Sequence, residues 1–314
     1  MIEIKRYKMG QHMTVLIYGH KGWIGNQFVE LCQTHDVNYV LGNSRVDSED
    51  RLIEEIDAIR PTHIVSLIGR THGKIGDKEY TTIDYLEQPG KLRENIRDNL
   101  FSPLLLAMIA KEKDIHFTYL GTGCIFEYDD HHPFGREING FTEESLPNFF
   151  GSSYSVVKGF TDRLMKYYEK NTLQLRIRMP ITPHPNPRNF ITKITNYKKI
   201  CSIPNSMSVL SDLLPIMLQM MKDGKTGTYN FTNPGLVSHN EILEMYREIV
   251  DPSFVWENFT MDEQNQILDS KRSNNFLNTE KLEEAYPIPH IKDSIRNLLS
   301  TYKSSLESSS PSIV

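Results

Sequence analysis

The chain has 314 residues, 39% hydrophobic and 24% charged, a balance typical of a globular protein with a sizeable core. The net charge of -5 argues against a nucleic-acid partner, which would need a basic face, and no apolar run reaches the ~18–20 residues of a membrane span. Cys32, Cys124 and Cys201 lack metal-ligand or disulfide spacing. We therefore expect no metal site, no membrane and a reducing, cytoplasmic setting.

The first predicted elements are a strand over 13–18, a glycine turn and a helix over 26–33, after a polar extension over 1–12. The first glycine permits the tight turn, the second lets the backbone approach a pyrophosphate, and the third lets the helix lie close to the strand. The alternative is a purely structural turn. The residues predicted to contact a dinucleotide are Gly19, Gly22, Trp23, Ile24 and Gly25.

A second predicted strand over 37–41 leads to Arg45. A site selective for NAD usually places an acidic residue at this strand end, to bind the ribose 2′-hydroxyl. None stands there, and Arg45 could bind a 2′-phosphate, although a solvated arginine is an equal alternative. We expect NADPH as the cofactor and leave NADH open.

The alternation of helices and buried strands then continues, and it favours a doubly wound parallel sheet of the α/β class. Its elements are a helix over 52–59, a strand over 61–68, a polar connection over 69–90, a helix over 91–111 with an irregularity at Pro103, and a strand over 117–120.

The stretch Gly121-Thr122-Gly123-Cys124 ends that last strand, and Tyr154 and Lys158 follow on a predicted helix. Residues four apart on a helix face the same way. A nearby ammonium stabilises a phenolate, so we expect Lys158 to lower the pKa of Tyr154. With the hydroxyl of Thr122, these groups predict a carbonyl-reducing site in which Tyr154 gives the proton to oxygen.

Beyond this helix the pattern predicts a strand over 173–178 and a proline-rich boundary over 183–187. We expect a dinucleotide-binding domain over 13–180, a substrate-binding lobe over 181–300 from which 203–232 returns to the first domain, and a disordered tail over 301–314. Elements predicted in the lobe are helices over 190–197, 212–222, 240–250, 262–268 and 279–285, and a strand over 227–232.

The whole combination resembles the extended short-chain dehydrogenase/reductase superfamily, a Rossmann fold with a smaller mixed C-terminal lobe. Longer runs resemble its nucleotide-rhamnose synthase/epimerase-reductase family, over roughly residues 14 to 300. These runs include Gly121-Thr-Gly-Cys-Ile-Phe-Glu-Tyr128, Arg178-Met-Pro-Ile181, Asn186-Pro-Arg-Asn-Phe-Ile-Thr-Lys193, Ile203-Pro-Asn-Ser-Met207, Asn230-Phe-Thr-Asn-Pro-Gly235 and Arg272-Ser-Asn-Asn275.

The resemblance implies a bifunctional 3,5-epimerase/4-reductase that converts UDP-4-keto-6-deoxy-D-glucose to UDP-L-rhamnose with NADPH. By resemblance, Cys124 and Lys193 are the acid/base pair of the epimerase, without an assignment of which is acid and which is base. From the residues alone, Cys124 would be a small buried hydrophobe and Lys193 a solvated lysine. His184 is a rival acid without a match in the family pattern.

The resemblance also makes Asn99 a support of Lys158 and Arg272 a clamp on the diphosphate, a role that suits a guanidinium; the alternatives are a helix-surface asparagine and a surface ion pair. Asn189 and Asn205 are candidate contacts to the sugar or uracil. His239 is expected to be structural.

Two features depart from the family pattern. Ser66-Leu-Ile-Gly69 replaces a run like Asn-Ala-Ala, and the charged segment 70–90 also differs, so cofactor contacts there are open. The chain leaves no room for the dehydratase domain of the plant enzymes, so a separate UDP-glucose 4,6-dehydratase is the expected pathway partner. A homodimer is left open.

Two other functions remain open at this point. One is a 4-keto reductase without epimerase activity, like the dTDP-4-dehydrorhamnose reductases, which would need neither Cys124 nor Lys193. The other is a non-catalytic sensor of NADPH, against which the complete set of Thr122, Tyr154 and Lys158 argues.

Overall fold

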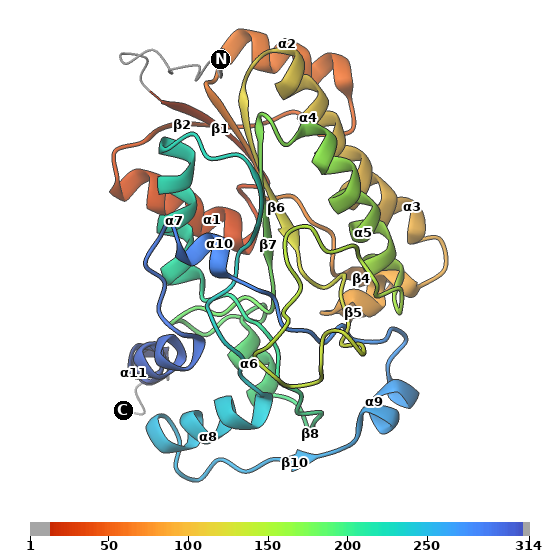
Figure 1. Cartoon of the computed structure of the whole chain (residues 1–314), viewed down its shortest axis with the longest axis vertical. Helices are drawn as coiled ribbons and strands as arrows, with labels where there is room; N and C mark the ends of the chain where they lie inside the picture. The colour runs from red at the N-terminus through yellow and green to blue at the C-terminus, as the bar shows by residue number, and fades with distance from the viewer. Residues whose placement is uncertain (1–12, 310–314) are drawn as a thin grey trace.

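The computed structural model describes residues 13–309, and its centre is a six-stranded parallel sheet with the order β2-β1-β3-β6-β7-β9 (Figure 1). Repeated crossovers through helices produce this order, which confirms the predicted doubly wound α/β class. The strands are β1 (Thr14–Tyr18), β2 (Asn38–Leu41), β3 (His63–Ser66), β6 (His116–Thr122), β7 (Thr172–Ile177) and β9 (Gly227–Asn230).

Helices cover both faces of the sheet, because each strand alternates its side chains between two separate cores. Val15 and Ile17 of β1 pack into one core with α1 and α7, whereas Leu16 and Tyr18 pack into the other with α2 and α4. Figure 1 shows these helices on opposite sides of the strands. Their bounds are α1 (Trp23–Thr34), α2 (Glu49–Ile59), α4 (Ser102–Glu112), α5 (Ser153–Met165) and α7 (Leu210–Lys222).

A smaller lobe lies beyond the carboxyl ends of the strands and has a core of its own (Figure 1). The chain enters it after β7, returns to the sheet through α7 and β9, and then enters the lobe again. Its elements are α6 (Phe190–Thr195), β8 (Lys199–Ile200), α8 (His239–Ile249), β10 (Glu257–Asn258), α9 (Met261–Ile267) and α11 (Ile291–Ser309). The short helix α10 (Glu280–Glu283) instead packs Leu282 into the core between the sheet, α1 and α7.

Helix α11 corrects the prediction of a disordered tail. It continues to Ser309, and Leu298, Leu299 and Tyr302 are buried in the core of the lobe. The serine-rich composition concealed these apolar positions, which recur at helical spacing. The polar extension over 1–12 and the last residues, 310–314, lie outside the described residues.

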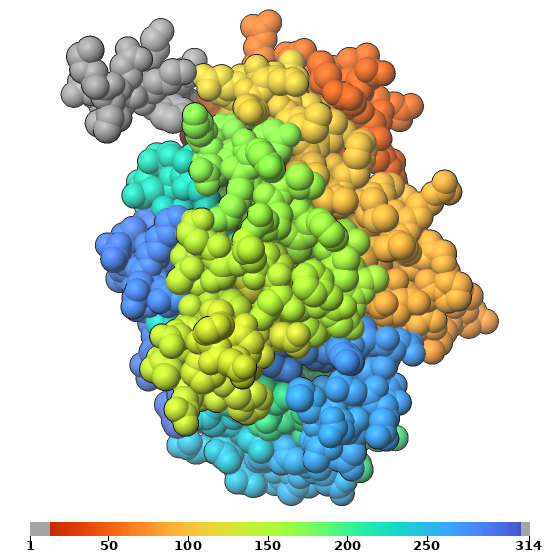
Figure 2. All heavy atoms as spheres, turned by 45° about the vertical axis from the view of Figure 1, so that its right-hand side comes forward, coloured from red at the N-terminus to blue at the C-terminus, as the bar shows by residue number. Residues whose placement is uncertain are grey.

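The polar connection over 69–90 is more ordered than predicted. It contains a hairpin of β4 (Gly73–Ile75) and β5 (Lys78–Tyr80) and the 3₁₀ helix η1 (Ile83–Glu87). The carboxylate of Glu87 accepts the backbone N–H of Ser153 at 2.7 Å, so this segment contacts the first turn of α5. Figure 2 shows it meeting the segment that contains α9, where Gln88 donates to Asp269 at 2.9 Å.

The helix predicted over 91–111 is broken into three parts. α3 (Leu92–Ile96) and α4 flank a π-helical turn, η2 (Arg97–Phe101), which contains Asn99. The irregularity therefore lies just before Pro103 and not at it. No helix in the described part of the chain is long and apolar enough to cross a membrane.

A pair of buried histidines closes the amino end of β3 and β6. The rings of His63 and His116 lie 4.9 Å apart between centroids. Burial, with the neighbouring His116, lowers the pKa of His63 to about 4, and burial also lowers the pKa of His116. Both therefore stay neutral in the folded protein at neutral pH.

We predict that this pair makes the protein acid-sensitive. Unfolded histidine takes up a proton near pH 6.5, so the free energy of unfolding falls as pH drops below 6.5. For His63 the fall is about 1.4 kcal/mol per pH unit until its folded pKa of about 4 is reached, and His116 adds a fall in the same direction. Denaturant titrations at several pH values measure this slope. His63→Asn should make it shallower, and the exposed His131→Asn serves as control; an unchanged slope in H63N would contradict the assignment.

Candidate active site

Three of the predicted catalytic residues, Thr122, Cys124 and Tyr154, meet at the carboxyl end of β6. Thr122 is the last residue of this strand and is buried, and its Oγ1 accepts the backbone N–H of Cys124 at 3.0 Å. Tyr154, at the start of α5, hydrogen-bonds to Thr122 and packs against Cys124. A hydroxyl, a phenol and a thiol thus share one location, contributed by a strand, a turn and a helix.

Burial sets the protonation of the phenol. It raises the pKa of Tyr154, with a further increase from Cys124, and the hydrogen bond to Thr122 opposes this only in part. The prediction that Lys158 lowers the pKa of Tyr154 is therefore wrong. Tyr154 remains protonated at neutral pH, which is the form needed to give a proton to an oxygen.

Lys158 has a partner that the sequence analysis missed. Its Nζ donates to the phenol oxygen of Tyr119 on β6 at 2.6 Å. Burial lowers the pKa of Lys158 to about 8, against the opposing effects of Asp162 and Cys124. Asp162 itself pairs with Arg176 at 2.8 Å, so its carboxylate acts on Lys158 through space and not by direct contact.

Asn99 acts on this helix indirectly. Its backbone carbonyl accepts the hydroxyl of Thr161 on α5 at 2.6 Å. Its side-chain oxygen accepts the backbone N–H of Arg70 at 2.9 Å, and its side-chain nitrogen donates to the backbone carbonyl of Arg70 at 2.8 Å. No hydrogen bond joins Asn99 to Lys158 within residues 13–309. The π-helical turn thus fixes the loop after β3 against α5, and the support of Lys158 stays a prediction.

The glycine turn has the geometry that a bound phosphate group requires. Gly19 adopts a φ of +81°, and a Cβ on Gly25 would lie 2.1 Å from the carbonyl oxygen of Gly19. α1 begins at Trp23 directly after the turn, and no side chain caps its first N–H groups. These donors and the helix dipole favour an anion at this position.

A cavity of about 230 Å³ adjoins this turn, and Gly19, Gly42 and Arg45 are among the residues that line it. Arg45 is exposed and pairs with Asp47 at 2.9 Å. The guanidinium at the rim therefore already has one acidic partner. Its predicted contact with a 2′-phosphate remains a prediction.

Cationic side chains of the lobe gather near His72, in the connection after β3. Lys193 on α6 is half-buried, and burial together with Arg188 and Arg272 lowers its pKa. Arg188 contacts the ring of His72, which lies before β4. Arg188 and Lys193 form no ion pair with any described residue, so an anionic group between the two parts would find cations ready to bind it.

Arg272 forms the ion pair that was the alternative to a diphosphate clamp. Its Nη2 lies 2.6 Å from Oδ2 of Asp84, a carboxylate that also accepts from Ser270. To bind a diphosphate, Arg272 would have to give up or share its ion pair with Asp84. The role of Arg272 as a clamp stays a prediction.

Asn189 and Asn205 do not present their side chains to a ligand, which corrects the prediction of sugar or uracil contacts. Both residues are fully buried. The amide of Asn189 caps α6 and donates to the carbonyls of Thr182 and His184. The side-chain oxygen of Asn205 accepts from Arg178 at 2.9 Å, and its side-chain nitrogen donates to the carbonyl of Ile203 at 3.2 Å and to Oδ1 of Asn274 at 2.8 Å. The residue type gave no indication of this burial.

His184 and His239 of the lobe lie outside the catalytic group. His184 is exposed and its Nδ1 lies 2.8 Å from Oγ of Ser305. His239 is the first residue of α8 and packs edge-on against Phe190.

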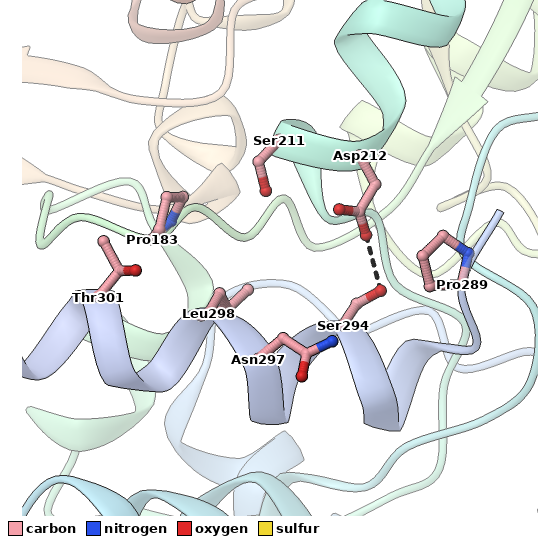
Figure 3. A pocket seen from close by; sticks show the side chains of 8 residues that line it. All are labelled: Pro183, Ser211, Asp212, Pro289, Ser294, Asn297, Leu298 and Thr301. Carbon is pink, nitrogen blue, oxygen red and sulfur yellow. Dashed lines mark hydrogen bonds between the residues drawn. The ribbon is translucent and has the colours of Figure 1, made fainter.

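A second cavity, of about 280 Å³, lies between α7 and α11 (Figure 3). None of the predicted site residues lines it, and Ser294 donates to Asp212 at 2.7 Å there.

The sequence analysis missed several residues of the site besides Tyr119. Arg178 is buried, donates to Asn205 and Ser273, and leaves its Nε and Nη1 without a partner. Asn275 binds the turn that carries Cys124. Both residues stand in runs that carry the family resemblance, which was the available signal.

The chain was compared with known proteins. No family model matches it. A protein of Acanthamoeba polyphaga mimivirus is 53% identical over 292 residues, which cover 93% of this chain and 99% of the relative. A bifunctional dTDP-4-dehydrorhamnose 3,5-epimerase/dTDP-4-dehydrorhamnose reductase of Arabidopsis thaliana is 46% identical over 282 residues, 89% of this chain and 90% of the relative.

Solved structures agree with these relatives. The crystal structure of a UDP-rhamnose synthase from Acanthamoeba polyphaga mimivirus has a TM-score of 0.88 at 52% identity and covers 93% of this chain and 100% of its own. A dTDP-4-dehydrorhamnose reductase of Clostridium acetobutylicum, at 16% identity and a TM-score of 0.74, covers 91% of this chain and 98% of its own and supports the fold alone. The chain is an enzyme of the nucleotide-rhamnose synthase/epimerase-reductase family, within the extended short-chain dehydrogenase/reductase superfamily.

Proposed function

We propose that the protein converts UDP-4-keto-6-deoxy-D-glucose to UDP-L-rhamnose, by epimerisation at C3 and C5 followed by reduction at C4 with NADPH. The observation that carries this proposal is the meeting of Thr122, Tyr154 and Cys124 at the end of β6. A reductase needs the first two. The thiol beside them adds a group that can exchange protons with the carbons next to the carbonyl.

The glycine turn and the cavity beside it fit the proposed cofactor. A side chain at Gly25 would overlap the carbonyl of Gly19, so the turn keeps the close backbone approach that a pyrophosphate needs. NADPH, when bound, supplies the hydride that reduces C4. The guanidinium of Arg188, which has no ion pair with a described residue, would receive the diphosphate side of the substrate.

Epimerisation depends on the acidity of the protons at C3 and C5, both next to the C4 carbonyl. When a base removes one of them, the charge moves to O4. Tyr154 and Thr122 would donate hydrogen bonds to this oxygen and stabilise the enolate. Cys124 and Lys193 are the proposed proton carriers, and burial with two neighbouring arginines lowers the pKa of Lys193 towards the range where an amine can exchange protons.

Reduction uses the same oxygen contacts. As C4 becomes tetrahedral, charge develops on O4, and Tyr154 gives it the proton that burial keeps on the phenol. Lys158, with a pKa of about 8, is the nearest cation on α5 to restore that proton.

The proposed mechanism also sets conditions outside the site. The thiol of Cys124 must stay reduced, which suits the cytoplasm. A separate 4,6-dehydratase would supply the keto sugar.

The direct test follows NADPH loss at 340 nm and the sugar product by NMR, with UDP-4-keto-6-deoxyglucose as substrate. We expect UDP-L-rhamnose. The same assay with the dTDP sugar measures nucleotide preference. No oxidation of NADPH with either sugar would refute the proposal and leave the sensor alternative; reduction without a change at C3 and C5 would leave the simple reductase.

We predict that Cys124→Ala separates the two activities. Loss of the thiol should abolish entry of solvent deuterium at C3 or C5, because one proton carrier is missing. The reduction of a sugar that a separate 3,5-epimerase has already epimerised should persist, since Tyr154 and Thr122 remain. Unchanged deuterium entry in C124A would remove the thiol from the mechanism.

We predict that Arg45→Ala weakens NADPH selectively. A charged hydrogen bond to the 2′-phosphate contributes about 1.5–3 kcal/mol, equivalent to roughly 10–100-fold in KM. NADH lacks this phosphate, so its KM should not change. Steady-state kinetics with both cofactors measure the difference, and an equal effect on NADPH and NADH would show that Arg45 does not bind the phosphate.

A further inference from the structure

The turn that carries Cys124 is held by groups from distant parts of the chain. It spans 123–126, beyond the end of β6; the pairing with β7 ends at Thr122 and Ile177, apart from the N–H of Gly123, which donates to the carbonyl of Ile177 at 3.0 Å. Each of its four carbonyls nevertheless accepts a hydrogen bond. Such complete pairing fixes the position of the Cys124 backbone.

The middle of the turn is bound by α5 and by the segment that precedes it. The carbonyl of Cys124 accepts the hydroxyl of Ser155 at 2.7 Å, and that of Ile125 accepts the N–H groups of Asn148 and Phe149 at 3.2 and 3.1 Å. These contacts connect the turn to the helix that carries Tyr154.

Both ends of the turn are bound by one side chain. The amide nitrogen of Asn275 lies 3.0 Å from the carbonyl oxygen of Gly123 and 2.9 Å from that of Phe126. Asn275 is fully buried, so no water replaces these two bonds. Ser273 supports the same end, with its hydroxyl 2.6 Å from the carbonyl of Phe126.

The residues of reduction are held by other means. Thr122 lies in β6, where it pairs with Ile177 of β7. Tyr154 lies in α5, whose first turn is capped by the hydroxyl of Ser152. Neither depends on the amide of Asn275.

We propose that Asn275 is a positioning residue for Cys124 that serves epimerisation and not reduction. The inference rests on the proposed function, in which Cys124 carries a proton to or from a carbon next to C4. Proton transfer requires a close, aligned approach, and a displacement of about 1 Å costs on the order of 100-fold in rate. Reduction uses only groups that stay in place.

The test measures the two half-reactions separately in the full-length protein. Deuterium entry at C3 and C5 is followed by NMR, in deuterated buffer with the UDP-keto sugar and without NADPH. Reduction is followed with NADPH and a pre-epimerised 4-keto sugar. For Asn275→Ala we expect deuterium entry to fall about 100-fold, while kcat for reduction changes less than about 2-fold.

Asn230→Ala is the matched control. The amide of Asn230 is also fully buried and donates to two backbone carbonyls, those of Phe141 and Asn278, both at 2.8 Å. It binds neither Gly123 nor Phe126. Its loss should lower the melting temperature in the same way and leave the ratio of exchange to reduction unchanged.

The outcomes are distinct. If N275A lowers exchange and reduction equally, or if N230A changes their ratio as much, Asn275 is merely structural and the inference fails. Should N275A not fold, Asn275→Asp keeps the side-chain shape while placing an oxygen against the two carbonyls, and the same selective loss is expected. A wild-type protein that catalyses no exchange would instead refute the proposed epimerase.

Discussion

Two cations are buried beside the end of β6 without forming an ion pair with any residue in 13–309, and the arrangement of the site depends on them. Lys158 is bound by the phenol of Tyr119, and Arg178 by the amide of Asn205 and the carbonyl of Ser273. Burial lowers the pKa of each. An unpaired buried charge costs several kcal/mol, so neutral acceptors must be supplied at fixed places.

The need for neutral acceptors explains why segments that are distant in the sequence meet at Arg178. Asn205 and Ser273 come from the lobe, yet both accept hydrogen bonds from Nη2 of Arg178, an arginine that follows β7. A Cβ on Gly123 would lie 3.0 Å from Cγ of Arg178, so the arginine passes directly beneath the turn of Cys124. The same positive surroundings favour a reaction in which negative charge develops on the substrate.

Much of the fold and part of the site could be predicted from the sequence, because both depend on local pattern. The glycine turn and the strand that ends at Thr122 are encoded by residues close in the chain. The partner of Lys158 could not be predicted, since Tyr119 reaches it across the sheet-helix boundary. Asn189 and Asn205 were misjudged because an amide side chain has the same chemistry whether it binds a ligand or a backbone, and only burial distinguishes the two.

The fully paired turn has a consequence for the motion of the substrate. With its carbonyls bound on every side, the backbone of Cys124 has little freedom to travel. C3 and C5 lie on opposite sides of C4, so a sulfur fixed in one place cannot meet both in the same pose. In the proposed mechanism, a thiol that serves both carbons therefore requires the sugar ring to pivot about O4 between the two inversions, within a frame that stays fixed.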